Sequence, residues 1–172
     1  MLKIIGSVLV IFGCTAMGFY MVDRMKRHIR ELEQVKKQLL FMEGEIRVGF
    51  RPIKDIFAQL EQRTEGDWNA FYSFVQKSME GEVQCSLGRV WQDGIKETLK
   101  TSLLHQNEKR IWRELGENLG YLDKEMQIAL LKICEEHFEE FRLQAEEYLK
   151  GNAKIYQTLG IMGGIFLTII FV

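Results

Sequence analysis

The two residues best suited to metal chemistry are Cys134 and His137, which lie three positions apart in a predicted helix. A thiolate and an imidazole at this spacing can share a zinc ion, because residues three apart are neighbours on a helix surface. A structural zinc site needs four ligands, and no other Cys or His lies close to this pair in the sequence. We therefore predict that the pair binds no metal.

Other patterns that could support catalysis lack the context that the chemistry requires. Cys85 has no adjacent His or basic residue to activate its thiol. The glycines of Gly116-Glu117-Asn118-Leu119-Gly120 follow a predicted helix instead of a strand, which argues against a dinucleotide-binding turn. No Ser/His/Asp arrangement and no glycine-rich phosphate loop is recognisable. We predict a protein with no enzymatic activity and no cofactor.

Carboxylates supply the most prominent charged feature, an acidic strip formed by Glu135, Glu136, Glu139 and Glu140 and continued beyond Arg142 by Glu146 and Glu147. Two interpretations remain open: a solvated face of an amphipathic helix, or a docking strip for a basic partner. The formal net charge of −1 indicates no nucleic-acid partner. The three cysteines form no C-x-x-C pair, which is typical of a reducing compartment.

A long uncharged run lies near each end of the chain, the first of them directly after Lys3. The uncharged runs are Ile4 to Val22 and Ile155 to Val172, and as helices they would extend about 28 Å and about 27 Å. These lengths are close to the hydrocarbon thickness of a bilayer. We predict two transmembrane helices; a cleaved signal peptide is the alternative for the first run, although that run is longer than a typical signal core.

Basic residues flank both predicted spans on the side of the central region. They are Arg24, Lys26, Arg27, Arg30, Lys150 and Lys154. Because basic residues near span ends stay cytoplasmic, we expect a cell-membrane protein with two spans, a cytoplasmic domain and both termini outside. The predicted organisation is residues 1–22 as the first span, 23–154 as the cytoplasmic bundle and 155–172 as the second span.

Small residues recur at four-residue spacing in both spans. Cys14 and Gly18 form one pair, and Gly160 and Gly164 form the other. This spacing lets two membrane helices approach closely, so we expect the two pairs to face each other or other subunits. The alternative is that glycine is simply common in membrane helices.

The central region is predicted to be all-α, because it contains apolar residues at helical spacing and the chain has one proline. Heptad stripes mark its first and last helices, with Leu32, Leu39 and Ile46 on one and Leu131 and Phe138 on the other. Shorter helices between them should complete a bundle. Predicted helix N-caps are Asp67, Asn107 and Asp123, and residues Gly81 to Ser86 are a predicted loop.

Several stretches together resemble the stage III sporulation protein AB family of endospore-forming bacteria. The most specific is Leu119-Gly120-Tyr121-Leu122-Asp123-Lys124-Glu125-Met126-Gln127, which is similar to the family's Leu-Gly-x-x-Asp-x-x-x-Gln turn. The others are the opening Met1-Leu2-Lys3 span with Gly13 and Gly18, and Leu40 to Ile46 leading to Pro52-Ile53. Tyr121-Leu122 is more apolar than the usual pair in the family.

The resemblance implies a platform component of a secretion-like channel complex in the mother-cell membrane facing the forespore. It implies two kinds of protein partner: a secretion-type ATPase and other membrane subunits of the sporulation channel complex. The lipid bilayer is a further predicted partner, and a homo-oligomer is compatible with the sequence. On this basis partner-binding roles are expected for Leu119, Gly120, Asp123 and Gln127, with the acidic strip. A membrane-tethered adaptor or signalling bundle that binds a regulatory protein is the alternative, and a pore is disfavoured because the spans lack polar lining residues.

Overall fold

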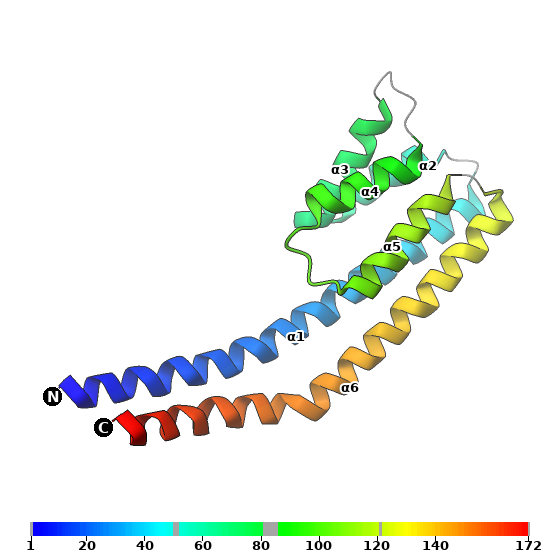
Figure 1. Cartoon of the computed structure of the whole chain (residues 1–172). Helices are drawn as coiled ribbons and strands as arrows, with labels where there is room; N and C mark the ends of the chain where they lie inside the picture. Colours follow the sequence, from blue (N-terminus) through cyan, green and yellow to red (C-terminus); the bar gives the residue numbers. More distant parts are fainter. Residues whose placement is uncertain (1, 50–51, 81–85, 121, 172) are drawn as a thin grey trace. The chain divides into compact units, whose positions relative to one another are not determined.

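The computed structural model describes residues 2–49, 52–80, 86–120 and 122–171, and within these ranges every regular element is an α-helix (Figure 1). This confirms the predicted all-α class. The six helices in the described ranges are α1 (Leu2–Val48), α2 (Ile53–Arg63), α3 (Gly66–Glu80), α4 (Leu87–Thr98), α5 (Gln106–Leu119) and α6 (Lys124–Phe171).

Two compact units can be distinguished. The first consists of Met1–Arg30 with Arg142–Val172, and the second of Glu31–Phe141. We call them the terminal unit and the central unit. The two longest helices each contribute to both units, since α1 has 47 residues and α6 has 48. The predicted boundaries at residues 22 and 155 concern where the chain would leave the membrane. The division into two units is based on packing within the chain and does not test them, so they stay predictions.

The central unit is built on a cluster of aromatic rings from α2, α3, α4, α5 and α6. The ring of Trp91 lies 4.9 Å from that of Phe71 and 5.2 Å from that of Trp112, measured between centroids. The indole N–H of Trp91 donates to the backbone carbonyl of Trp112 at 2.8 Å, so this buried donor is satisfied. The aromatic-rich pattern Trp68, Phe71, Tyr72, Phe74 and Val75 predicts a core face of α3, and all of these residues are buried except Phe74, which is half-buried.

Glycine in α5 permits the close crossing of α4 and α5. A Cβ atom at Gly116 would lie 2.1 Å from the Trp91 ring, and one at Gly88 would lie 3.0 Å from the backbone of Glu117. These distances are too short for any larger residue without movement of the helices. Gly116 is therefore needed for the packing of the large Trp91 ring. This structural role accounts for the glycine in the sequence Gly116-Glu117-Asn118-Leu119-Gly120.

The heptad stripes predicted for the first and last helices are confirmed inside the central unit. Leu32, Val35, Leu39 and Met42 of α1 are all fully buried, and so is Phe138 of α6. Burial of these apolar side chains contributes roughly 1.5–3 kcal/mol each. The heptad spacing of α6 also predicts a second seam through Cys134, Phe141, Tyr148 and Ile155, and this seam is not buried along its whole length, because Tyr148 and Ile155 are both more than half exposed.

One of the predicted helix caps is confirmed and two are wrong. The Asp123 carboxylate accepts the backbone N–H of Met126 at 2.9 Å, which caps the start of α6. Asp67 lies inside the first turn of α3, because Gly66 with φ of 60° already begins that helix. Asn107 lies inside α5; His105 is the N-cap, and its backbone N–H donates to the Glu108 carboxylate. The predicted loop 81–86 lies outside the described residues except for Ser86, which precedes α4.

Candidate functional site

The closest approach within the terminal unit joins α1 and α6 at the predicted small-residue positions. A Cβ atom at Gly18 would lie 2.6 Å from the carbonyl oxygen of Tyr156, and one at Gly160 would lie 2.8 Å from the carbonyl oxygen of Cys14. At Gly164 it would lie 2.9 Å from the Cα atom of Ile11. The contacts run in opposite chain directions, so the two segments are antiparallel. Their backbones touch without intervening side chains.

The helix that carries Cys14 and Gly18 is long and apolar enough to cross a membrane. In the described part of the chain it is the one helix that meets this criterion. In its N-terminal part, Leu9 and Phe12 are more than two-thirds exposed. An exposed apolar helix of this length suggests membrane association.

A cleft of about 520 Å³ lies between α1 and α6 in the terminal unit, where the basic residues gather. Its lining includes Lys26 and Arg30 of α1 and Lys150 of α6, beside the apolar Ile29 and Leu149. Glu146 also lines it, but its carboxylate is paired with Arg142. Three of the six predicted juxtamembrane basic residues therefore meet at one cleft; Arg24, Arg27 and Lys154 are exposed outside its lining.

The acidic strip on α6 is partly engaged by the central unit itself. The Lys36 ammonium of α1 lies 3.1 Å from the Glu139 carboxylate and 3.8 Å from that of Glu135. Both carboxylates are only a quarter to a third exposed. Glu136 and Glu140 lie on the exposed side of the helix. The strip therefore has an inner pair that holds α1 against α6 and an outer pair that faces solvent.

Residues of the turn between α5 and α6 have clear intramolecular roles. The Gln127 side-chain amide donates to the carbonyl oxygens of Leu119 at 2.8 Å and Leu122 at 3.1 Å. It thereby satisfies backbone groups at the end of α5, while Asp123 caps α6. Leu119 is buried, and Gly120 lies against the Leu87 side chain. These contacts give the motif a structural role, because they join the end of α5 to the start of α6.

Cys134 and His137 do not face the same environment. The Cys134 side chain is buried, whereas His137 is exposed. Burial, with a smaller effect from the nearby Glu114 charge, raises the pKa of the Cys134 thiol to about 11. A thiol with this pKa stays protonated at neutral pH and behaves as a small apolar core group.

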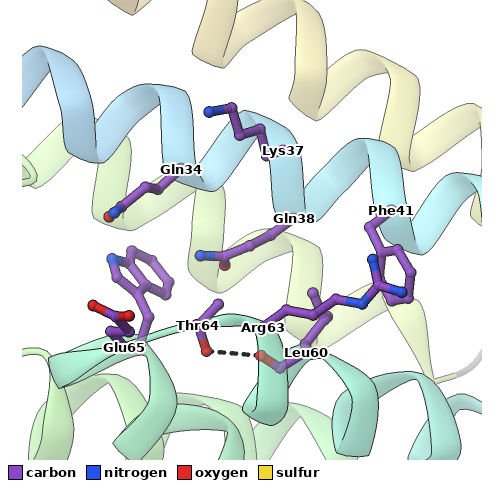
Figure 2. A pocket seen from close by; sticks show the side chains of 9 residues that line it. Gln34, Lys37, Gln38, Phe41, Leu60, Arg63, Thr64 and Glu65 are labelled. Carbon is purple, nitrogen blue, oxygen red and sulfur yellow. Dashed lines mark hydrogen bonds between the residues drawn. The ribbon is translucent and has the colours of Figure 1, made fainter.

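A polar pocket in the central unit was not anticipated from the sequence. It has a volume of about 500 Å³ and is lined by α1, the end of α2 and the turn leading into α3 (Figure 2). The lining residues are Gln34, Lys37, Gln38, Phe41, Leu60, Arg63, Thr64, Glu65 and Trp68. The one sequence signal was Gln38, a polar residue between the buried Val35, Leu39 and Met42.

Contacts around this pocket fix its walls. The Arg63 guanidinium lies 4.3 Å from the centroid of the Phe41 ring, a favourable cation–π distance. The Thr64 hydroxyl donates to the Leu60 carbonyl at 2.8 Å, as drawn in Figure 2. The Asn69 amide donates to the Glu61 carbonyl at 2.7 Å. The turn between α2 and α3 is therefore held by side-chain hydrogen bonds on both sides.

Comparisons with known proteins agree with this helical architecture. The family model described as stage III sporulation protein AB matches residues 3–172. The chain is similar to Stage III sporulation protein AB of Bacillus subtilis (strain 168), with 27% identity over 174 residues and 99% of each chain covered. A solved structure of Stage III sporulation protein AB has the same fold, with a TM-score of 0.59 and 23% identity over 70% of this chain and 94% of that one. Since the family model spans nearly the whole chain, the protein belongs to the stage III sporulation protein AB family.

Proposed function

We propose that this sporulation protein is a non-enzymatic membrane platform. Its central unit would bind a cytoplasmic secretion-type ATPase, and its terminal unit would contact the channel subunits in the mother-cell membrane that faces the forespore. The observation that carries the proposal is the continuity of α1 and α6, each a single helix of about 70 Å that belongs to both units. A force or displacement applied to the bundle would reach the membrane along two unbroken helices.

We propose that the C-terminal part of α6 is a second span. Its large apolar side chains are exposed, with Leu159, Phe166 and Ile169 each more than 60% accessible. The close contacts of Gly18 with Gly160 and of Gly164 with Ile11 would hold the two spans together as a hairpin. Both termini would then lie outside, and the central unit would be cytoplasmic.

The basic cleft of the terminal unit supports this orientation. Lys26, Arg30 and Lys150 surround it, and its apolar floor is formed by Ile29 and Leu149. Anionic headgroups of the cytoplasmic leaflet would fit such a cleft, and each basic residue near the surface contributes about 1 kcal/mol to this attraction. The cleft would lie at the headgroup level of the inner leaflet.

The outer pair of the acidic strip, Glu136 and Glu140, is exposed on α6, while Glu135 and Glu139 lie close to Lys36. We propose that Glu136 contributes to ATPase binding and that the inner pair stabilises the fold. Exposed charges of this kind affect association rate and specificity more than total affinity.

A binding experiment with the full-length chain in nanodiscs tests the platform proposal. The secretion-type ATPase from the same organism should bind the nanodiscs, and Glu136→Lys should weaken binding several-fold at low salt. Glu97→Lys is the control, because Glu97 is also an exposed glutamate of the central unit but lies on α4, outside the strip. Recovery of only a regulatory protein from cells, with no ATPase bound at micromolar concentrations, would contradict the proposal.

A further inference from the structure

The pocket beside Gln38 and Trp68 contains two buried hydrogen-bond donors that lack a partner. The exposed fraction is 4% for each of these residues. Among the residues that the structure describes, no acceptor lies within hydrogen-bonding distance of the Gln38 amide nitrogen or the Trp68 indole nitrogen. Leaving a buried donor unsatisfied costs about 1–3 kcal/mol, so two in one pocket need an explanation.

The orientation of the Gln38 amide is set by Tyr72. The Tyr72 hydroxyl donates to the Gln38 side-chain oxygen at 2.8 Å, and both residues are buried. Burial raises the pKa of Tyr72 well above its ordinary value, so its hydroxyl keeps its proton and needs an acceptor. With the oxygen of Gln38 committed to Tyr72, its NH₂ group is the part that remains for the pocket.

Trp68 provides a donor whose chemistry is unambiguous, because an indole nitrogen can only donate. Its ring is held by an edge-to-face contact with Trp112 at 5.3 Å between centroids. Buried donors without partners also occur at Gln76 and Trp112, but neither residue lines this pocket. The pocket is distinguished by two such donors together with two cationic side chains, Lys37 and Arg63.

The rim of the pocket is exposed and carries more positive than negative charge. Lys37, Arg63 and Gln34 are exposed lining residues, and Glu65 is the one acidic residue among the described residues of the lining. In Figure 2 the Arg63 guanidinium lies beside the Phe41 ring, and the Lys37 side chain extends away from Gln38. Figure 2 shows the Gln38 side chain extending from α1 toward Thr64 on the opposite wall. Charged, exposed side chains thus line the same pocket as the two buried N–H donors.

We propose that this pocket binds an acidic segment of a partner protein, with a Glu or Asp carboxylate and nearby backbone carbonyls accepting from Gln38 and Trp68. A carboxylate is acceptor-only and carries the charge that Lys37 and Arg63 favour. A cationic segment would bring further donors to a pocket that already has unpaired donors. The inference goes beyond the platform proposal, since it does not require the partner to be the ATPase.

Carbodiimide cross-linking in native membranes tests the proposal on the full chain. This reagent joins an amine directly to a carboxylate, so a bound acidic segment should couple to Lys37. Lys77 is the matched control, because it is an exposed lysine of the same unit that does not line the pocket. We expect links from Lys37 to Asp or Glu of another protein at about ten times the yield of links from Lys77.

Variants of the buried donors separate specific binding from proximity. Gln38→Glu keeps an acceptor for Tyr72 and places a negative charge in the pocket, and Trp68→Phe keeps an aromatic ring but removes the N–H. Each should reduce the Lys37 links about tenfold, since a hydrogen bond to a charged group typically contributes that much to affinity. Circular dichroism of both purified variants identifies any loss that comes from unfolding.

Two results would overturn the proposal. One is that links from Lys37 reach only carboxylates of its own chain or are no more frequent than those from Lys77. The other is that folded Gln38→Glu and Trp68→Phe proteins give unchanged intermolecular links, which would mean that the buried donors bind water only. A positive result without the ATPase among the linked proteins would support the pocket, and the platform proposal would still be decided by the nanodisc binding experiment.

Discussion

The carbonyl oxygen of Tyr156 lies 2.6 Å from the position that a Cβ atom on Gly18 would occupy, which is too close for any residue other than glycine. The same Cβ would lie 3.4 Å from the Cα atom of Gly160. The two chain ends are therefore in backbone contact. Backbone contact brings Cα–H groups next to carbonyl oxygens, a weak but recurrent source of attraction between helices.

Substitution at Gly18 should separate α1 from α6. The obstructing atom is backbone, so Gly18→Ala cannot be relieved by a change of side-chain rotamer. We expect a loss of about 1–3 kcal/mol, the usual range for overpacking. The apparent midpoint of thermal unfolding in detergent, followed by circular dichroism, measures it. Gly13→Ala is the control: nothing lies within 4 Å of its added Cβ, and an equal loss in both variants would contradict the contact.

Two glycines of the central unit should respond to alanine with opposite signs. Gly116→Ala places a Cβ 2.1 Å from the buried Trp91 ring, and we expect destabilisation by about 1–3 kcal/mol. Gly44→Ala lies on an open part of α1 and should stabilise by up to about 1 kcal/mol through helix propensity. Denaturant unfolding followed by tryptophan fluorescence distinguishes them. Destabilisation by Gly44→Ala would show that this face of α1 is covered.

Removal of the Gln127 amide should loosen the turn between α5 and α6. Gln127→Ala leaves the carbonyl oxygens of Leu119 and Leu122 without this donor, and we expect a loss of about 1 kcal/mol. Hydrogen exchange should increase at the end of α5 and the start of α6. Gln62→Ala, an exposed position on α2, is the control. If both variants show the same exchange rates, the Gln127 hydrogen bonds do not stabilise this turn.

The thiol of Cys134 should resist modification while the protein is folded. In a Cys14→Ala/Cys85→Ala background, iodoacetamide should label it much more slowly than in the unfolded chain at pH 8, as measured by mass spectrometry. The pKa is raised from 9.0 to about 11, so between these values the unfolded state binds fewer protons than the folded state. Stability should therefore fall as the pH rises from about 9 to about 11. Rapid labelling at pH 8 would show that the site is open.

Local sequence patterns determined the helical class, the buried stripe and one of the caps. Leu32, Val35 and Leu39 recur at heptad spacing, and a stripe of this kind is buried whichever partner covers it. The wrong caps at Asp67 and Asn107 have a common cause. Each of these residues is the second residue of its helix, and the backbone geometry at Gly66 and the contact of Glu108 with His105 place the helix start before it.

The sequence alone determined an apolar end, a polar helical centre and a match to one family, because hydrophobic length and spacing are properties of the chain itself. Tertiary structure decided which charges are engaged: Lys36 approaches Glu135 and Glu139 across about a hundred residues. It also decided that Gln38, Arg63 and Trp68, taken from three helices, line one pocket. Pairings of this kind depend on how helices are placed side by side, which no local pattern encodes.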